Sequence, residues 1–214
     1  MKKYLFTGLV LTNVFLACGR VPKLGPETDT KLATASEEDC GFVQNIYGQR
    51  VSWKQSFPVK IYIDPSFPVE YNPVLTAAAQ KWESVLGKTL FVFERLKQTS
   101  TPGKDNQNVL YWLTSWAESD KTLEAVSSLS WTNNQLVETD IKIDAQYYSY
   151  YVSTPVSNTE VHLESLLVHE LGHILGLKHV SNSIPSVMLQ VLDYLLKRDT
   201  PTAEDQANLK CEYN

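Results

Sequence analysis

The stretch HELGHILGLKH, from His169 to His179, decides the fold and holds three of the four histidines in the chain. His169 and His173 stand four residues apart, so on a helix they lie one turn apart on the same face. Two imidazoles placed in this way can bind one Zn²⁺ ion, each at about 2.0–2.1 Å. Glu170 follows the first histidine and leans to the side of the metal, where a carboxylate can act as a general base toward water. The stretch therefore predicts a zinc site on a helix.

A third ligand is expected from His179. A catalytic zinc takes three protein ligands and leaves its fourth position open. Gly176 lets the chain leave the helix in a left-handed turn, and three residues later His179 can return to the metal. Without the turn, His179 would continue along the helix and miss the ion.

The spacing H-E-x-x-H-x-x-G-x-x-H, followed at short range by Ser186-Val187-Met188, resembles the metzincin metalloproteases and is most similar to their matrixin branch. The resemblance implies one catalytic Zn²⁺, ligands His169, His173 and His179, and a methionine turn at Met188. The alternative for Met188 is that its side chain only fills space in the hydrophobic core. The implied activity is that of an endopeptidase, with Glu170 as the general base and a protein or peptide as substrate.

The same resemblance suggests how a peptide would bind. An extended peptide would add to an edge strand near Leu123 to Ser128. The leucine-rich chain from Leu189 to Leu196 would line the pocket after the cut, with an apolar preference and with Tyr194 in its wall. A different class of function stays open, namely a surface lipoprotein that acts as an adhesin or binding module and holds only a structural zinc.

Hydrophobic patterning outside the zinc motif predicts an α+β fold with a twisted mixed sheet of about five strands. We expect one helix from the Asn72-Pro73 cap to Gly87, the zinc helix after a cap at Asn158, and a terminal helix with Thr202 and Asp205 as a capping box. Strands are expected at 59–64, 89–96, 108–113 and 136–144, with a weaker, irregular edge strand at 122–130.

The N-terminus has the pattern of an export signal. Lys2 and Lys3 precede a mostly apolar run from Tyr4 to Ala17, which is too short to span a bilayer comfortably. The following Cys18 resembles the lipidated cysteine of bacterial lipoproteins; a plain secretory signal is the alternative. We therefore expect a signal peptide at 1–17, a lipidated N-terminus with a flexible tether at 18–39, and a metalloprotease domain at 40–214.

The location implied is the bacterial cell envelope, with a lipid anchor in the membrane, or alternatively secretion. In an oxidising environment the remaining cysteines, Cys40 and Cys211, are expected to form a disulfide. Two alternatives remain for them: two free buried thiols, or Cys40 acting as an inhibitory thiolate on the metal. We find no inhibitory propeptide segment between Cys18 and Cys40 and expect no cysteine switch.

The amino-acid composition is typical of a soluble globular domain with an excess of acidic residues. The formal net charge is -5 and 43% of residues are hydrophobic, so no basic footprint indicates nucleic acid. We expect a monomer. Calcium through Asp140, Asp144 or loop carbonyls has no convincing ligand spacing. The fourth histidine, His162, is expected to face solvent near the start of the zinc helix, so a second zinc site is not expected.

Overall fold

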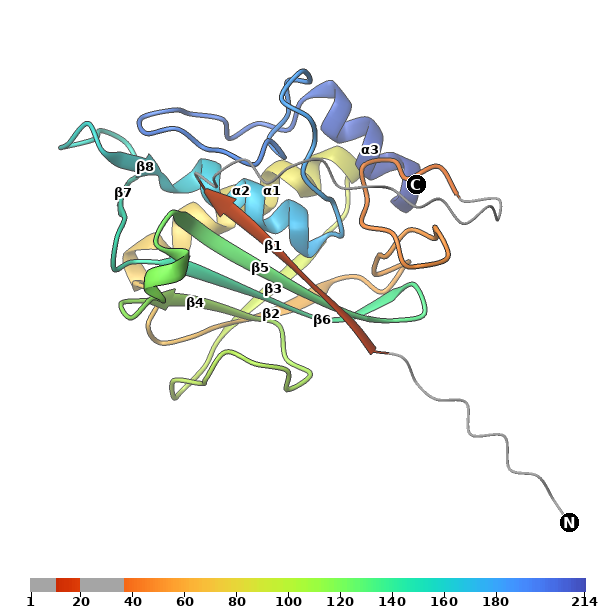
Figure 1. Cartoon of the computed structure of the whole chain (residues 1–214), viewed down its shortest axis with the longest axis horizontal. Helices are drawn as coiled ribbons and strands as arrows, with labels where there is room; N and C mark the ends of the chain where they lie inside the picture. Colours follow the sequence, from red (N-terminus) through yellow and green to blue (C-terminus); the bar gives the residue numbers. More distant parts are fainter. Residues whose placement is uncertain (1–10, 20–36) are drawn as a thin grey trace, which may run out of the picture.

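The sheet and the helices form two layers in the computed structural model, which describes residues 11–19 and 37–214. The sheet lies in the lower half of Figure 1, and the helices lie together above it. The three helices are α1 (Asn72–Leu86), α2 (Leu163–Ile174) and α3 (Ala203–Tyr213). Within the described ranges, no helix has the length and apolar character needed to cross a membrane.

The main sheet has six strands and mixed direction. Its order is β1-β5-β6-β4-β2-β3, where the strands are β1 (Leu11–Gly19), β2 (Val59–Ile63), β3 (Phe91–Arg95), β4 (Val109–Leu113), β5 (Leu123–Thr132) and β6 (Gln135–Asp144). The pairs among β2, β3, β4 and β6 are parallel, whereas β5 runs antiparallel to β6 and β1 antiparallel to β5. The predicted α+β class and five of these strands are confirmed, and β1 is an addition.

Strand β5 differs most from its prediction. It is a strand of ten residues with a register irregularity between Ser130 and Trp131 in its pairing with β6, and it is paired along both sides rather than at the edge of the sheet. The sequence signal for this strand is weak because both faces of β5 are largely buried, so polar and apolar residues do not alternate cleanly. The predicted edge position of β5 is therefore wrong in this structure, because β1 pairs with its outer side.

Helix α2 occupies the centre of the molecule, between α1 and the sheet. Eleven of its twelve residues are buried. Trp82 on α1 is fully buried and donates its indole N–H to the carbonyl of Val168 at 2.8 Å. Near the other end of α2, Trp53 donates its indole N–H to the carbonyl of Ile174 at 2.7 Å. Two buried indoles therefore fix the helix along its length.

Two predicted caps are wrong. Helix α1 begins at Asn72 with Tyr71 as its N-cap, and the Asn72 side chain instead accepts from Arg95 at 2.9 Å. Helix α2 begins after His162 rather than after Asn158. A short strand, β8 (Glu160–His162), pairs there with β7 (Ser149–Tyr151) and takes up the residues expected in the first turn.

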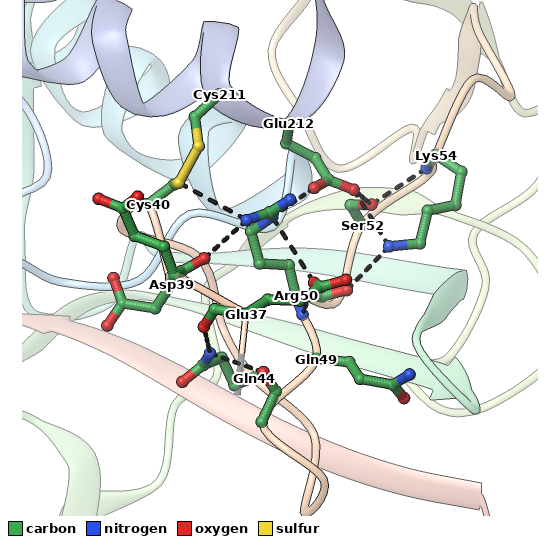
Figure 2. A network of polar contacts seen from close by, with 12 residues as sticks. Glu37, Asp39, Cys40, Gln44, Gln49, Arg50, Ser52, Lys54, Cys211 and Glu212 are labelled. Atoms are coloured by element: carbon green, nitrogen blue, oxygen red, sulfur yellow. Dashed lines mark hydrogen bonds and ion pairs between the residues drawn. A yellow bond between two sulfur atoms is a disulfide. The ribbon is translucent and has the colours of Figure 1, made fainter. Parts of the chain in front are cut away.

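The start and the end of the domain are tied together (Figure 2). Cys40 and Cys211 form the predicted disulfide, so the idea that Cys40 binds the metal as a thiolate is wrong. Beside the disulfide, Arg50 contacts Glu212 at 2.5 Å and Lys54 contacts it at 3.1 Å. The predicted capping box of α3 is also present, with Thr202 and Asp205 as its members. These bonds fix α3 against the segment in which the folded domain starts.

The predicted tether lies mostly outside the described residues, which resume at position 37. The predicted signal region is described only from Leu11 onward, where its end forms β1. Figure 1 shows β1, in red, along the outer side of β5.

Candidate metal centre

The three histidines predicted as ligands converge at the end of α2. His169 and His173 are buried on the helix, and the chain reverses at Gly176 to bring His179 back to them. Gly176 has φ 100°, a conformation that favours glycine, and a Cβ at this position would lie 2.5 Å from the carbonyl of Val51. The turn predicted from the sequence therefore exists, and it requires glycine.

The ring nitrogens are arranged to accept a cation. His169 Nδ1 donates to the carbonyl of Val187 at 2.6 Å, and His173 Nδ1 donates to the carbonyl of Leu177 at 2.8 Å. In neutral rings this leaves both Nε2 atoms with a free lone pair. The Nε2 atom of His179 lies 3.3 Å from that of His169 and 3.1 Å from that of His173. Three Nε2 atoms thus point at one spot.

These distances fit zinc. Four ligands at about 2.0–2.1 Å in a tetrahedron have nitrogen atoms about 3.3–3.4 Å apart. Burial holds the pKa of His169 and of His173 well below the usual range and, with the positive charge of Arg198, lowers the pKa of His179 to about 4. Neutral imidazoles are the form that binds metal, so the cluster is ready to bind without first losing protons.

Met188 lies directly beneath the zinc helix. A Cβ on Gly172 would collide with the sulfur of Met188, so this glycine allows the close approach. The backbone at Val187 accepts the bond from His169, and Val187 N–H in turn donates to the buried Asp205 at 3.0 Å. The turn around Met188 therefore connects the first histidine to the capping box of α3.

Glu170 is fully buried beside the histidines. Its Oε2 accepts a hydrogen bond from the hydroxyl of Ser127 on β5 at 2.6 Å, and its Oε1 is buried and accepts no hydrogen bond from the residues that the structure describes. Burial raises the pKa of Glu170 to about 7, and contacts with Cys18 and Ser127 oppose this rise. A carboxylate with a pKa near neutrality suits a group that takes up and returns a proton.

Strand β1 brings a fourth candidate ligand to the cluster. Cys18 is buried, and its sulfur lies 3.5 Å from Nε2 of His173 and 3.5 Å from Nε2 of His179. In a tetrahedral zinc site with a Zn–S bond of about 2.3 Å, sulfur and nitrogen ligands are about 3.5–3.6 Å apart. Cys18 and the three histidines could therefore hold one ion together. Burial and the Glu170 carboxylate raise the pKa of the free thiol.

The segment after Met188 forms a wall beside the cluster. Arg198 shapes it, because its guanidinium donates to the carbonyl of Leu189 at 2.7 Å and to that of Val191 at 3.0 Å. Gly19, which follows Cys18, donates its N–H to the carbonyl of Gln190 at 3.3 Å. Tyr194 packs against Tyr148, with ring centroids 6.5 Å apart.

His162 does not face solvent, so that prediction is wrong. It is 1% exposed because β8 and the start of α2 enclose it. Its Nδ1 pairs with Ser165 Oγ at 2.8 Å and its Nε2 donates to the carbonyl of Val152 at 3.1 Å. The nearby carboxylates of Glu164 and Asp199 face the ammonium of Lys81 at 3.6 and 3.7 Å. The lysine charge therefore already balances the two carboxylates, which with His162 form a second cluster of possible metal ligands.

The two carboxylates considered for calcium both hold the backbone. Asp140 accepts the N–H of Val109 at 2.9 Å, and Asp144 accepts the N–H of Gln146 at 2.7 Å and of Tyr147 at 3.0 Å. These bonds fix the ends of β4 and β6, so each carboxylate has a role without an ion.

Sequence reasoning missed three residues at this site: Cys18, Ser127 and Arg198. Cys18 was assigned to lipidation, and its distance along the chain from the histidines gave no other signal. Ser127 could have been found, because it interrupts the buried, inward-facing row Ala125, Leu129 and Trp131 of β5. Arg198 carries no sequence signal.

Comparison with known proteins agrees with this arrangement. A sequence model of the matrixin family, described as Matrixin and classed among the metallopeptidases, matches residues 74–213. The match begins within α1 and includes β5, the zinc helix, the turn at Met188 and α3. A search of curated proteins finds no match.

Proposed function

Because the chain belongs to the matrixin family, we propose that it is a zinc-dependent endopeptidase that cuts extended segments of other proteins. The observation that carries this proposal is the convergence of three imidazole Nε2 atoms beside a buried glutamate whose Oε1 accepts no hydrogen bond. A purely structural metal site has no need for such a base.

The proposed roles follow from the geometry. His169, His173 and His179 would hold the zinc ion, with the first two rings oriented by bonds from Nδ1 to backbone carbonyls. A bound zinc ion supplies polarisation of the scissile carbonyl and lowers the pKa of an attacking water. Glu170 takes the proton of that water as it attacks and delivers it to the departing amine.

The substrate would bind as an additional strand on β5. Strand β1 already occupies this position, with Leu16 opposite Ser127 and Ala17 opposite Val126. An extended peptide in its place would gain backbone hydrogen bonds from β5 and contact the Leu189–Leu196 wall past the cut. We propose an apolar preference in that wall, which includes the buried Leu192.

We further propose that the protein is exported and anchored in the bacterial cell envelope through a lipid on Cys18. The support is the sequence alone: two lysines, an apolar run and a cysteine at the expected spacing. A lipid on sulfur would prevent the same sulfur from binding zinc. The two states of Cys18 therefore exclude each other.

One observation favours a second candidate function, a binding protein with a structural zinc. Cysteine with three histidines is a closed set of four ligands, which is the pattern of structural rather than catalytic zinc sites. In this alternative Cys18 would stay on the metal and no position would be open for water.

Cleavage of an unfolded protein substrate separates the two functions. Residues 38–214 and the full chain would be compared, each as wild type, Glu170→Ala and Glu170→Gln, with zinc content measured in all six proteins. We expect the shorter wild-type protein to cut, both Glu170 variants to lose activity by a factor of about 1,000 or more, and zinc to stay bound. Retained zinc without cleavage in every protein would favour the binding function.

A further inference from the structure

Ser127 is the polar exception in the row of β5 side chains that faces the zinc helix. Its neighbours in that row are Ala125, Leu129 and Trp131, and all four residues are buried. Ser127 itself is 0% exposed, so its hydroxyl cannot turn to solvent. A buried hydroxyl without a hydrogen bond costs about 1–3 kcal/mol, so the bond that it makes decides its role.

The partner of this hydroxyl is the general base. Ser127 Oγ donates to Glu170 Oε2 at 2.6 Å, across the space between β5 and α2. A hydroxyl donor to a carboxylate at this distance is a strong, charge-assisted hydrogen bond. It fixes one of the two carboxylate oxygens, while Oε1 has no hydrogen-bond donor within residues 11–19 and 37–214. The carboxylate therefore keeps a single orientation in which only Oε1 is available.

Ser127 also belongs to the strand that takes up an extended chain. Its backbone lies opposite Ile141 of β6 on one side and opposite Leu16 of β1 on the other. The same residue therefore takes part in pairing with the added strand through its backbone and holds Glu170 through its side chain. Ser127 therefore links the binding of a peptide to β5 with the orientation of Glu170.

We propose that Ser127 is a positioning residue for the hydrolysis, which orients Glu170 so that Oε1 faces the attacking water. This inference rests on the proposed peptidase function. Ser127 touches neither the substrate carbonyl nor the metal, and it acts through the carboxylate of Glu170. Its loss should therefore slow the chemical step and leave zinc binding and substrate binding in place.

The test uses residues 38–214 in every protein, which lack β1 and Cys18, so that β5 is open to substrate and no thiol contacts Glu170. Ser127→Ala deletes the hydroxyl, and Ser127→Thr restores it. Ser52→Ala is the matched control, because Ser52 is equally buried and also donates to a carboxylate, that of Glu212, in the network of Figure 2. Zinc content, kcat, KM and Tm would be measured for each protein.

We expect Ser127→Ala to lower kcat by about 10- to 100-fold, with KM changed by less than about twofold and one zinc ion retained. Ser127→Thr should recover most of kcat, and Ser52→Ala should lower Tm without lowering kcat. If Ser127→Ala keeps kcat within about twofold of its parent while its Tm falls as in Ser52→Ala, the hydroxyl is only structural and the proposal is overturned.

A second readout does not depend on activity. In zinc-free protein, the Tm loss from Ser127→Ala would be measured in the Glu170 and Glu170→Ala backgrounds. We expect the loss to be at most half as large without Glu170, because Ser127 then has no partner to lose. Equal losses in both backgrounds would contradict the pairing. If no protein cleaves substrate but the Tm losses differ as expected, the peptidase function fails and the Ser127–Glu170 contact stands.

Discussion

Replacing Tyr213 by phenylalanine tests how the end of the chain supports the zinc helix. Tyr213 is 2% exposed and lies between the rings of Phe42 and Phe57. Its hydroxyl donates to the carbonyl of Leu175, at the end of α2, at 2.5 Å and accepts the backbone N–H of Trp53 at 3.2 Å. The substitution removes one oxygen atom and leaves a buried carbonyl and a buried amide without that partner.

Each buried group left without a hydrogen bond costs about 1–3 kcal/mol, so the two together should lower the free energy of unfolding by about 2–6 kcal/mol. In a domain of this size, with about 2–4 °C per kcal/mol, the corresponding fall in Tm is about 4–24 °C. Urea unfolding followed by tryptophan fluorescence would measure the change. Tyr47→Phe is the control, because Tyr47 is 66% exposed and its hydroxyl should contribute less than about 0.5 kcal/mol. A loss below about 1 kcal/mol in Tyr213→Phe would refute the reasoning.

Three further predictions concern the disulfide, Asp140 and Cys18. The double variant Cys40→Ser, Cys211→Ser should lose about 4–5 kcal/mol of stability in urea unfolding, since the bridge joins residues separated by 171 positions. Burial raises the pKa of Asp140 to about 7, so its contribution to stability is highest near pH 4 and falls toward pH 7. In urea unfolding, the free energy of unfolding of the wild type should therefore fall over this range by at most about 1.4 kcal/mol per pH unit more than that of Asp140→Asn. The full chain produced without export and loaded with Co²⁺ should show a thiolate-to-metal absorption band that Cys18→Ala lacks.

Each of these predictions has an outcome that contradicts it. For the disulfide, it is equal stability of the wild type with and without a reducing agent. For Asp140, it is a parallel pH dependence of the wild type and the asparagine variant. For Cys18, it is an identical cobalt spectrum in the two proteins. A mass increase on Cys18 after export, together with the loss of the band, would support lipidation of the same sulfur.

The sequence predicted best the parts of the fold where local chemistry decides the structure. The end of α1 at Gly87, the capping box of α3, the turn at Gly176 and the convergence of the three histidines all follow from spacing within about a dozen residues. The disulfide was predicted because only one pair of cysteines remained after Cys18.

The errors lie where distant segments decide. Asn158 is a good cap in isolation, but β8 pairs with β7 and delays the helix to Leu163. His162 reads as a polar residue at a helix start, yet packing of Tyr151 and the bonds to Val152 and Ser165 bury it. In both places tertiary contacts override the local pattern.

The sequence predicted that the three histidines lie together but not which residues surround them. Motif spacing identifies residues that share one helix, but Cys18, Ser127 and Arg198 reach the cluster from other elements. Cys18 and Ser127 lie more than forty residues from their partners and Arg198 lies 19 residues from His179, and contacts over such separations leave no periodic trace in a single sequence. Only Ser127 left a signal, as a hydroxyl in an apolar row.

Titration of the zinc-stripped protein of residues 38–214 with Zn²⁺, with peptide cleavage measured at each addition, tests the central claim most directly. The account predicts that cleavage appears with the first equivalent, reaches its maximum at one ion per chain, and stays absent in Glu170→Ala although that variant binds the same single ion. A wild-type protein that binds one zinc ion tightly at the three histidines and cleaves no peptide would contradict it.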